Sequence, residues 1–162
     1  MARTICLRLL TVRARTRVEL RDALAARGVP ESASTTVLDR LADVGLVDDG
    51  AFAAGYVLSR QRERGLAVRQ ISRELRDKGV DDAVITAAVQ GSAAEADAEV
   101  ARQLVVRKLR SMTRLAPEVK TRRLVAMLAR KGYPPSMAFQ VVRDAVGACD
   151  EDTAPDDTAW LA

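Results

Sequence analysis

The feature that most constrains the fold of this 162-residue chain is a short pattern that occurs three times. Two apolar residues four positions apart are followed by a basic residue and a glycine, and the three glycines are 51 and 53 residues apart. The apolar spacing is that of one face of a helix, and the glycine is a typical helix stop. The three copies are Leu20-x-x-x-Leu24-x-x-Arg27-Gly28, Ile71-x-x-x-Leu75-x-x-Lys78-Gly79 and Leu124-x-x-x-Leu128-x-x-Lys131-Gly132.

Each copy predicts a group of three helices. A proline or aspartate follows soon after each glycine and starts a second helix, and a further helix precedes each copy, at about residues 2–14, 49–64 and 92–112. Such a group buries its apolar face poorly by itself, so neighbouring groups must stack. We therefore expect an all-α fold of three tandem three-helix repeats in an elongated, curved helical array. The expected boundaries are residues 1–45, 46–91 and 92–147, followed by an acidic, disordered tail over residues 148–162.

The composition excludes large classes of enzymes. The chain has no histidine, which rules out His-ligated metals and nucleophiles activated by histidine. Neither the GxxxxGK[ST] nor the GxGxxG phosphate-binding motif is present. We expect a protein that is not an enzyme and that needs no metal and no cofactor.

The sequence also indicates the compartment. No segment approaches the roughly 18 uninterrupted apolar residues of a membrane span. The two cysteines, Cys6 and Cys149, are far apart and form no CxxC motif, which is typical of a reducing compartment. We expect a cytoplasmic protein with no membrane partner.

The charge is distributed unevenly along the chain. Residues 1–149 contain 26 basic and 17 acidic residues, whereas the segment from Asp150 onward contains five acidic residues and no basic one. Arginine accounts for 22 of the 26 cations, and its planar guanidinium suits phosphate and carboxylate groups. A basic body of this kind favours a polyanionic partner, which is nucleic acid or a complex that contains it.

The cations gather near the predicted helix junctions in each repeat. A solvated helix face is one explanation, and a favourable interaction with the helix dipole is another, especially for Arg27, Lys78 and Lys131 in their last helical turns. The recurrence of the clusters favours a continuous basic surface for nucleic acid or a complex that contains it. The residues predicted to form it are Arg13, Arg15, Arg17, Arg60, Arg62, Arg64, Arg69, Arg73, Arg107, Lys108, Arg110, Arg114, Lys120, Arg122 and Arg123.

Asp48 and Asp49 form a conspicuous acidic pair. Two adjacent carboxylates could serve acid–base or Mg²⁺ chemistry. However, Phe52 and Tyr56 follow at helical spacing, so we favour one aspartate as the cap of a helix and the other as a charge near its positive end.

The same region carries a resemblance to a known family. The string Gly45-Leu46-Val47-Asp48-Asp49-x-x-Phe52-Ala53-x-x-Tyr56-Val57 resembles the signature of the RecX family of bacterial recombination regulators. The resemblance covers about residues 4–147 and implies tandem three-helix repeats, with Asp48, Asp49, Phe52 and Tyr56 as structural motif residues. It also implies binding to the RecA filament on single-stranded DNA and inhibition of ATP hydrolysis, strand exchange and co-protease activity by RecA, with a role in DNA repair and the SOS response.

The expected partners are thus RecA in its nucleoprotein filament, single-stranded DNA and, weakly, duplex DNA, with the protein acting as a monomer. Two alternatives remain open. The helices within residues 17–44 resemble a helix-turn-helix unit, which fits a sequence-tolerant DNA-binding protein that acts without RecA. The chain could also be a helical adaptor in which the positive charge is incidental. The tail, which ends near Trp160-Leu161, serves solubility or folds over the basic surface and competes with DNA.

Overall fold

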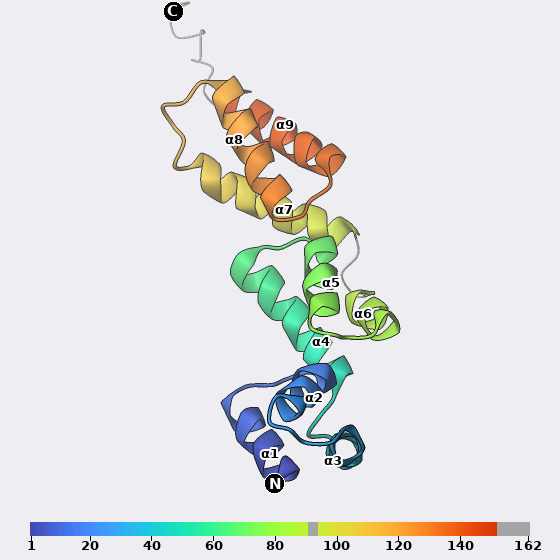
Figure 1. Ribbon diagram of the computed structural model, residues 1–162. Coiled ribbons are helices and arrows are strands. Elements are labelled where there is room, and N and C mark those ends of the chain that lie inside the picture. The colour runs from blue at the N-terminus through green and yellow to red at the C-terminus, as the bar shows by residue number, and fades with distance from the viewer. Residues whose placement is uncertain (91–93, 152–162) are drawn as a thin grey trace, which may run out of the picture. The chain divides into compact units, whose positions relative to one another are not determined.

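The computed structural model describes residues 1–90 and 94–151, which form helices joined by turns, with no strand in these ranges (Figure 1). This confirms the all-α prediction. The elements are α1 (Ala2–Val12), α2 (Arg17–Ala25), α3 (Glu31–Asp43), α4 (Asp49–Ser59), the π-helical turn η1 (Arg60–Arg64), α5 (Val68–Asp77), α6 (Asp82–Val89), α7 (Ala94–Leu109), α8 (Pro117–Arg130) and α9 (Pro135–Glu151).

The helices pack in threes. The first helix group comprises α1–α3, the second α4–α6 and the third α7–α9, and within each group all three helices contact one another. The first two groups form one compact N-terminal unit. The third group and the segment Gly65–Ala67 form a C-terminal unit.

The Gly65–Ala67 segment belongs to the C-terminal unit because it is bonded to the turn after α8. The Ala67 backbone N–H donates to the Lys131 carbonyl at 3.0 Å, and the buried Tyr133 hydroxyl donates to the Gly65 carbonyl at 3.1 Å. Burial also raises the pKa of Tyr133, with a smaller contribution from the charge of Asp97. The hydroxyl therefore stays a hydrogen-bond donor throughout the physiological range.

The repeated basic-glycine pattern ends a helix in the same way in each group. The residue after each glycine donates its N–H to the carbonyl five positions earlier, and the glycine itself donates three positions back, which is a Schellman motif. The glycines adopt the positive φ angles that this motif requires. The apolar pairs that define the pattern are fully buried in all three copies: Leu20 and Leu24, Ile71 and Leu75, and Leu124 and Leu128.

The start of α2 is joined to the end of α5. Thr16 and Glu19 form a capping box, in which the Thr16 hydroxyl accepts from the Glu19 N–H and the Glu19 carboxylate accepts from the Thr16 N–H. The same hydroxyl donates to the Lys78 carbonyl at 2.8 Å, and the Lys78 ammonium donates to Glu19 at 3.1 Å. Lys78, which the sequence places near a helix dipole, thus also links the first and second helix groups.

The acidic pair serves two different helices. Asp48 is the N-cap of α4 and accepts from the Ala51 N–H at 2.9 Å, as a capping residue should. Asp49 lies in the first turn of α4, and its carboxylate accepts from the Arg17 N–H at 2.8 Å. This second bond satisfies the first N–H of α2, so Asp49 also connects the two helix groups of the N-terminal unit.

Two expected helix ends differ in the structure. The predicted helix at about residues 49–64 is α-helical only to Ser59 and continues as the π-helical turn. The expected tail boundary at residue 148 lies inside α9, which extends to Glu151 because no proline or other helix-breaking residue intervenes after Gly147. Residues 152–162, with Trp160 and Leu161, lie outside the described residues.

Gly79 offers a test of the contact between the first two groups. A Cβ atom at Gly79 would lie 2.6 Å from the side chain of Val18, whereas a Cβ at Gly28 would meet nothing within 4 Å, and both residues have φ above +70°. We expect Gly28→Ala to cost roughly 1 kcal/mol of unfolding free energy from backbone strain alone. Gly79→Ala should cost about 1–3 kcal/mol more through overpacking. Urea unfolding followed by far-ultraviolet circular dichroism measures both, and equal costs would contradict the Gly79–Val18 contact.

Glu19 makes the stability of the N-terminal unit dependent on pH. Burial would raise the pKa of Glu19, but hydrogen bonds from Arg13, Lys78 and the Thr16 N–H together lower it below the usual 4.5. The stabilisation is therefore complete above about pH 4.5 and is lost as the pH falls through the lower folded-state pKa. We expect Glu19→Gln, which keeps the capping box, to cost about 1 kcal/mol at neutral pH and progressively less below pH 4.5. Urea titrations across this range, with the exposed Glu31→Gln as control, measure the effect, and a constant cost at all pH values would contradict it.

Candidate nucleic-acid interface

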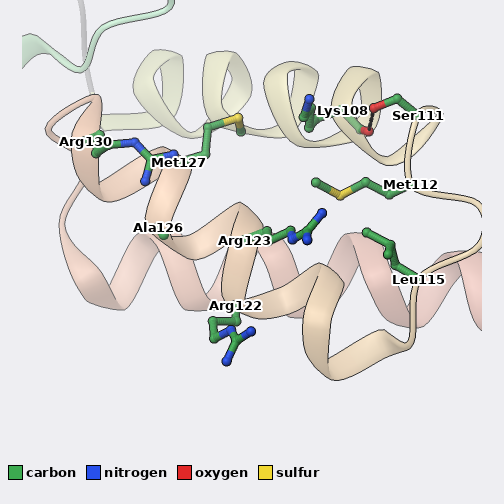
Figure 2. Close-up of a pocket in the computed structure, with 9 residues that line it drawn as sticks. All are labelled: Lys108, Ser111, Met112, Leu115, Arg122, Arg123, Ala126, Met127 and Arg130. Atoms are coloured by element: carbon green, nitrogen blue, oxygen red, sulfur yellow. Dashed lines mark hydrogen bonds between the residues drawn. The ribbon is translucent and has the colours of Figure 1, made fainter.

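The clearest candidate site is a cationic pocket on the C-terminal unit, between the end of α7 and the outer face of α8. Its volume is about 480 Å³, and Figure 2 shows the residues that line it. Among the described residues, its charged lining consists of Lys108, Arg122, Arg123 and Arg130, with no acidic side chain. Ser111, Met112, Leu115, Ala126 and Met127 complete the wall.

The amphipathic pattern of α8 places these cations on the pocket side. Leu124 and Leu128 are fully buried in the core of the C-terminal unit. Arg123, Ala126 and Arg130 follow one another at spacings of three and four on a different face of the helix, and they line the pocket. On α7, the buried Val105 and Leu109 similarly leave Lys108 exposed to solvent.

The lining of the pocket combines charged and apolar side chains. Met112 is buried in the core cluster, and Leu115 and Met127 pack against that cluster from partly buried positions. Methionine is flexible and polarizable, so it adapts to flat or irregular apolar groups. A pocket with this lining can hold phosphate oxygens at the guanidinium groups while a nucleic-acid base covers the apolar side chains.

The structure brings together only some of the predicted cations of this region. Lys108, Arg122 and Arg123 meet in the cationic pocket, together with Arg130, which the sequence analysis did not select. Its spacing of seven from Arg123 was the signal that could have identified it. Arg114 is exposed on the connection before α8, and Lys120 is half-buried on α8.

Arg107 lies on another part of α7, and Arg110 directly follows the end of that helix. They line a shallower hollow of about 380 Å³ with Arg102, Gln103, Val106 and Glu99. Hydrogen bonds from Gln103 and Arg102 lower the pKa of Glu99, so this hollow contains a carboxylate that stays ionised. The negative charge makes it less suited to phosphate than the cationic pocket.

Several predicted arginines of the N-terminal unit have carboxylate partners. Arg13 pairs with Glu19, Arg17 with Asp39, and Arg60 with Glu74. Arg15 is half-buried, while the remaining predicted cations of this unit are exposed: Arg62, Arg64, Arg69 and Arg73. Part of the positive charge of this unit is thus neutralised locally.

Phe52 and Tyr56, which follow the acidic pair Asp48 and Asp49 on α4, form an aromatic cluster beside Arg60. Tyr56 donates its hydroxyl to Glu74 at 2.7 Å and stacks with Phe52 at a centroid distance of 5.7 Å. The Arg60 guanidinium lies 4.5 Å from the centre of the Tyr56 ring. A hydrogen bond with Tyr56 is the largest contribution that raises the pKa of Arg60. These contacts give Phe52 and Tyr56 a packing role, and they hold Arg60 against the protein.

Within the described residues, no group of three or more His, Cys, Asp or Glu side chains could hold a metal ion. The described residues also include no helix that is long and apolar enough to cross a membrane.

Comparison with known proteins identifies the family. Three models, described as the first, second and third three-helix domains of RecX, match residues 2–41, 48–89 and 95–142. The chain belongs to the RecX family.

Relatives and solved structures agree with this assignment. The "Regulatory protein RecX" of Streptomyces lividans is 53% identical over 94% of this chain and 81% of its own length. The "Regulatory protein RecX" of Mycobacterium avium is 52% identical over 87% of this chain and 82% of its own. The crystal structure of RecX from Lactobacillus salivarius has a TM-score of 0.78 at 20% identity and covers 89% of this chain and 94% of that chain. A RecX crystal structure with a TM-score of 0.73 is 25% identical and covers 88% of this chain and 70% of that chain. The family assignment makes this chain a regulatory protein.

The cationic pocket predicts a specific change in DNA binding. We expect Arg122→Gln together with Arg123→Gln to weaken binding to an oligothymidylate, because two phosphate-binding cations are lost. The slope of log affinity against log salt should fall by about 0.7 for each lost phosphate contact. Fluorescence anisotropy titrations at several salt concentrations measure this, with Arg8→Gln on α1 as the matched control. Equal slopes for all three proteins would show that the pocket does not bind DNA.

Proposed function

We propose that this protein binds the RecA filament on single-stranded DNA and inhibits ATP hydrolysis, strand exchange and co-protease activity by RecA, and so modulates recombination, DNA repair and the SOS response in the cytoplasm. In this proposal it acts as a monomer and catalyses no reaction itself. The observation that carries the proposal is the pocket lined by both cations and apolar side chains on the third helix group of a RecX-family chain.

The pocket supports a nucleoprotein partner better than bare duplex DNA. In a duplex, base pairs are stacked inside and only the phosphates and groove edges are accessible. In a single strand the base faces are free, and the side chains of Met112, Leu115 and Met127 can contact them while the cations bind phosphate. Carboxylates on the acidic surface of a protein partner could form ion pairs with the same guanidinium groups.

Weak contacts at separate helix groups can add up in such a complex. Once one group is bound, its covalent link to the next raises the effective concentration of the second contact. A chain bound to several RecA protomers would oppose the relative movement of the protomers during ATP turnover. It would also exclude a second DNA strand or a protein substrate from the surface that it covers.

The proposal is tested by DNA-dependent ATP hydrolysis by RecA of the same organism, with substoichiometric amounts of this protein at two salt concentrations. We expect inhibition well below one molecule per RecA protomer, and weaker inhibition at high salt because the contacts are ionic. The Arg122→Gln, Arg123→Gln variant should inhibit less than wild type, whereas Arg8→Gln should not differ from it.

Two results would contradict the proposal. No inhibition together with tight binding to naked duplex would favour the DNA-binding protein that acts without RecA. Inhibition that is insensitive to salt and to the arginine substitutions would favour a helical adaptor whose contacts are not electrostatic.

A further inference from the structure

An exposed apolar hollow lies beside the cationic pocket. It is formed by α8 and α9, has a volume of about 560 Å³, and is lined by Pro117, Glu118, Thr121, Arg122, Val125, Ala126 and Phe139. Phe139 is 57% exposed although it is a large apolar side chain. An exposed apolar surface with a polar rim is typical of a docking site for another segment or protein.

The apolar hollow and the cationic pocket are continuous across α8. Arg122 and Ala126 line both of them. A ligand that covers the two surfaces must therefore combine an apolar anchor with nearby negative charge. Of the described residues that line the hollow, Glu118 in the first turn of α8 is the one that is acidic, and those that line the cationic pocket include no acidic residue.

One segment of this chain has that combination. Residues 150–162 contain Asp150, Glu151, Asp152, Asp156 and Asp157, no basic residue, and the apolar pair Trp160-Leu161. Trp160 is the single tryptophan of the sequence.

The segment also begins at the correct end of the C-terminal unit. α8 and α9 pack against each other and are joined by a short turn, so they run in opposite directions (Figure 1). The end of α9 at Glu151 therefore lies toward the start of α8 at Pro117, where one end of the apolar hollow is, and the hollow continues along α8 to Ala126 and to Phe139 of α9. Residues 152–162 can span at most roughly 36–40 Å. α8 is only about 21 Å long, so the segment can reach both the hollow and the cationic pocket.

We propose that residues 150–162 dock on their own C-terminal unit, with Trp160 in the apolar hollow beside Phe139 and the aspartates along the cations of the adjacent pocket. The docked segment competes with nucleic acid for Arg122 and Arg123. This competition rests on the proposed function, whereas the docking itself does not.

Tryptophan fluorescence of the full-length protein tests the docking directly. We expect the emission of Trp160 to lie at shorter wavelength, and its quenching by acrylamide to be weaker, than in a synthetic peptide of residues 150–162. Phe139→Ala should move both values toward those of the peptide. Leu58→Ala, at a 64% exposed residue of α4, is the matched control and should leave them unchanged.

A second variant changes the acidic side chains of the segment and leaves the sequences of α8 and α9 unaltered. Asp152→Asn, Asp156→Asn and Asp157→Asn together should also move the Trp160 emission toward that of the peptide, and added salt should do the same to the wild type. The docking is wrong if wild-type emission and quenching equal those of the peptide. A short-wavelength emission that disappears on dilution would also overturn it, because the segment would then occupy a second copy of the chain.

Competition is measured separately by titration with oligothymidylate. We expect the oligonucleotide to move the Trp160 emission of the wild type toward that of the peptide. The triple asparagine variant should bind the oligonucleotide roughly threefold to tenfold more tightly. Unchanged affinity of the variant for the oligonucleotide would contradict the proposed competition. Neither measurement involves RecA, so this outcome is distinguishable from a failure to inhibit RecA.

Discussion

The structure depends on the left-handed glycine that ends the central helix of each helix group. Gly28, Gly79 and Gly132 each close a Schellman motif, in which the next residue donates to the carbonyl of the buried leucine five positions back. The chain reverses there, so the next helix packs on the buried face of the preceding one. Because the glycine cannot be replaced without strain at positive φ, the pattern of leucine, basic residue and glycine specifies both the helix end and the core beneath it.

Most of the fold could be predicted because its determinants are local. The apolar spacing of Leu20 and Leu24, the capping box at Thr16 and the cap at Asp48 each involve residues within one or two helical turns. Local signals of this kind are visible in a single sequence. They also agree with one another along the chain, which is why the three-helix repeat is evident without structural information.

The contacts between helix groups could not be predicted in the same way. Asp49 accepts from Arg17, which is 32 residues away, and the Thr16 hydroxyl donates to Lys78, which is 62 residues away. Each of these groups also has a plausible local role at a helix terminus, so the sequence offers no reason to seek a distant partner. The π-helical turn after Ser59 could not be predicted either, because the position of Arg60 depends on its contacts with Glu74 and with the Tyr56 ring.

The candidate interface was predictable as a charged region but not as a pocket. Residues 102–131 contain ten basic residues and one acidic residue, and this imbalance is visible in the sequence. The selection of Lys108, Arg122, Arg123 and Arg130 from these cations depends on how α7 and α8 pack. The same packing places Met112 and Met127 in the lining beside the cations, and no sequence signal distinguishes a methionine of the core from one that lines a pocket.

The distribution of carboxylates gives the two units different electrostatic properties. In the N-terminal unit, Arg13, Arg17 and Arg60 have acidic partners, and these pairs hold helices and turns in place. In the part of the chain that the structure describes, no acidic residue lines the cationic pocket, so its cations repel one another until an anion binds. A bound anion removes that repulsion and is attracted by several cations at once, which favours a polyanion over a single small ion. The acidic segment after residue 149 is the nearest polyanion in the sequence, and the apolar hollow beside Phe139 supplies the second contact that a nucleic-acid strand would have to displace.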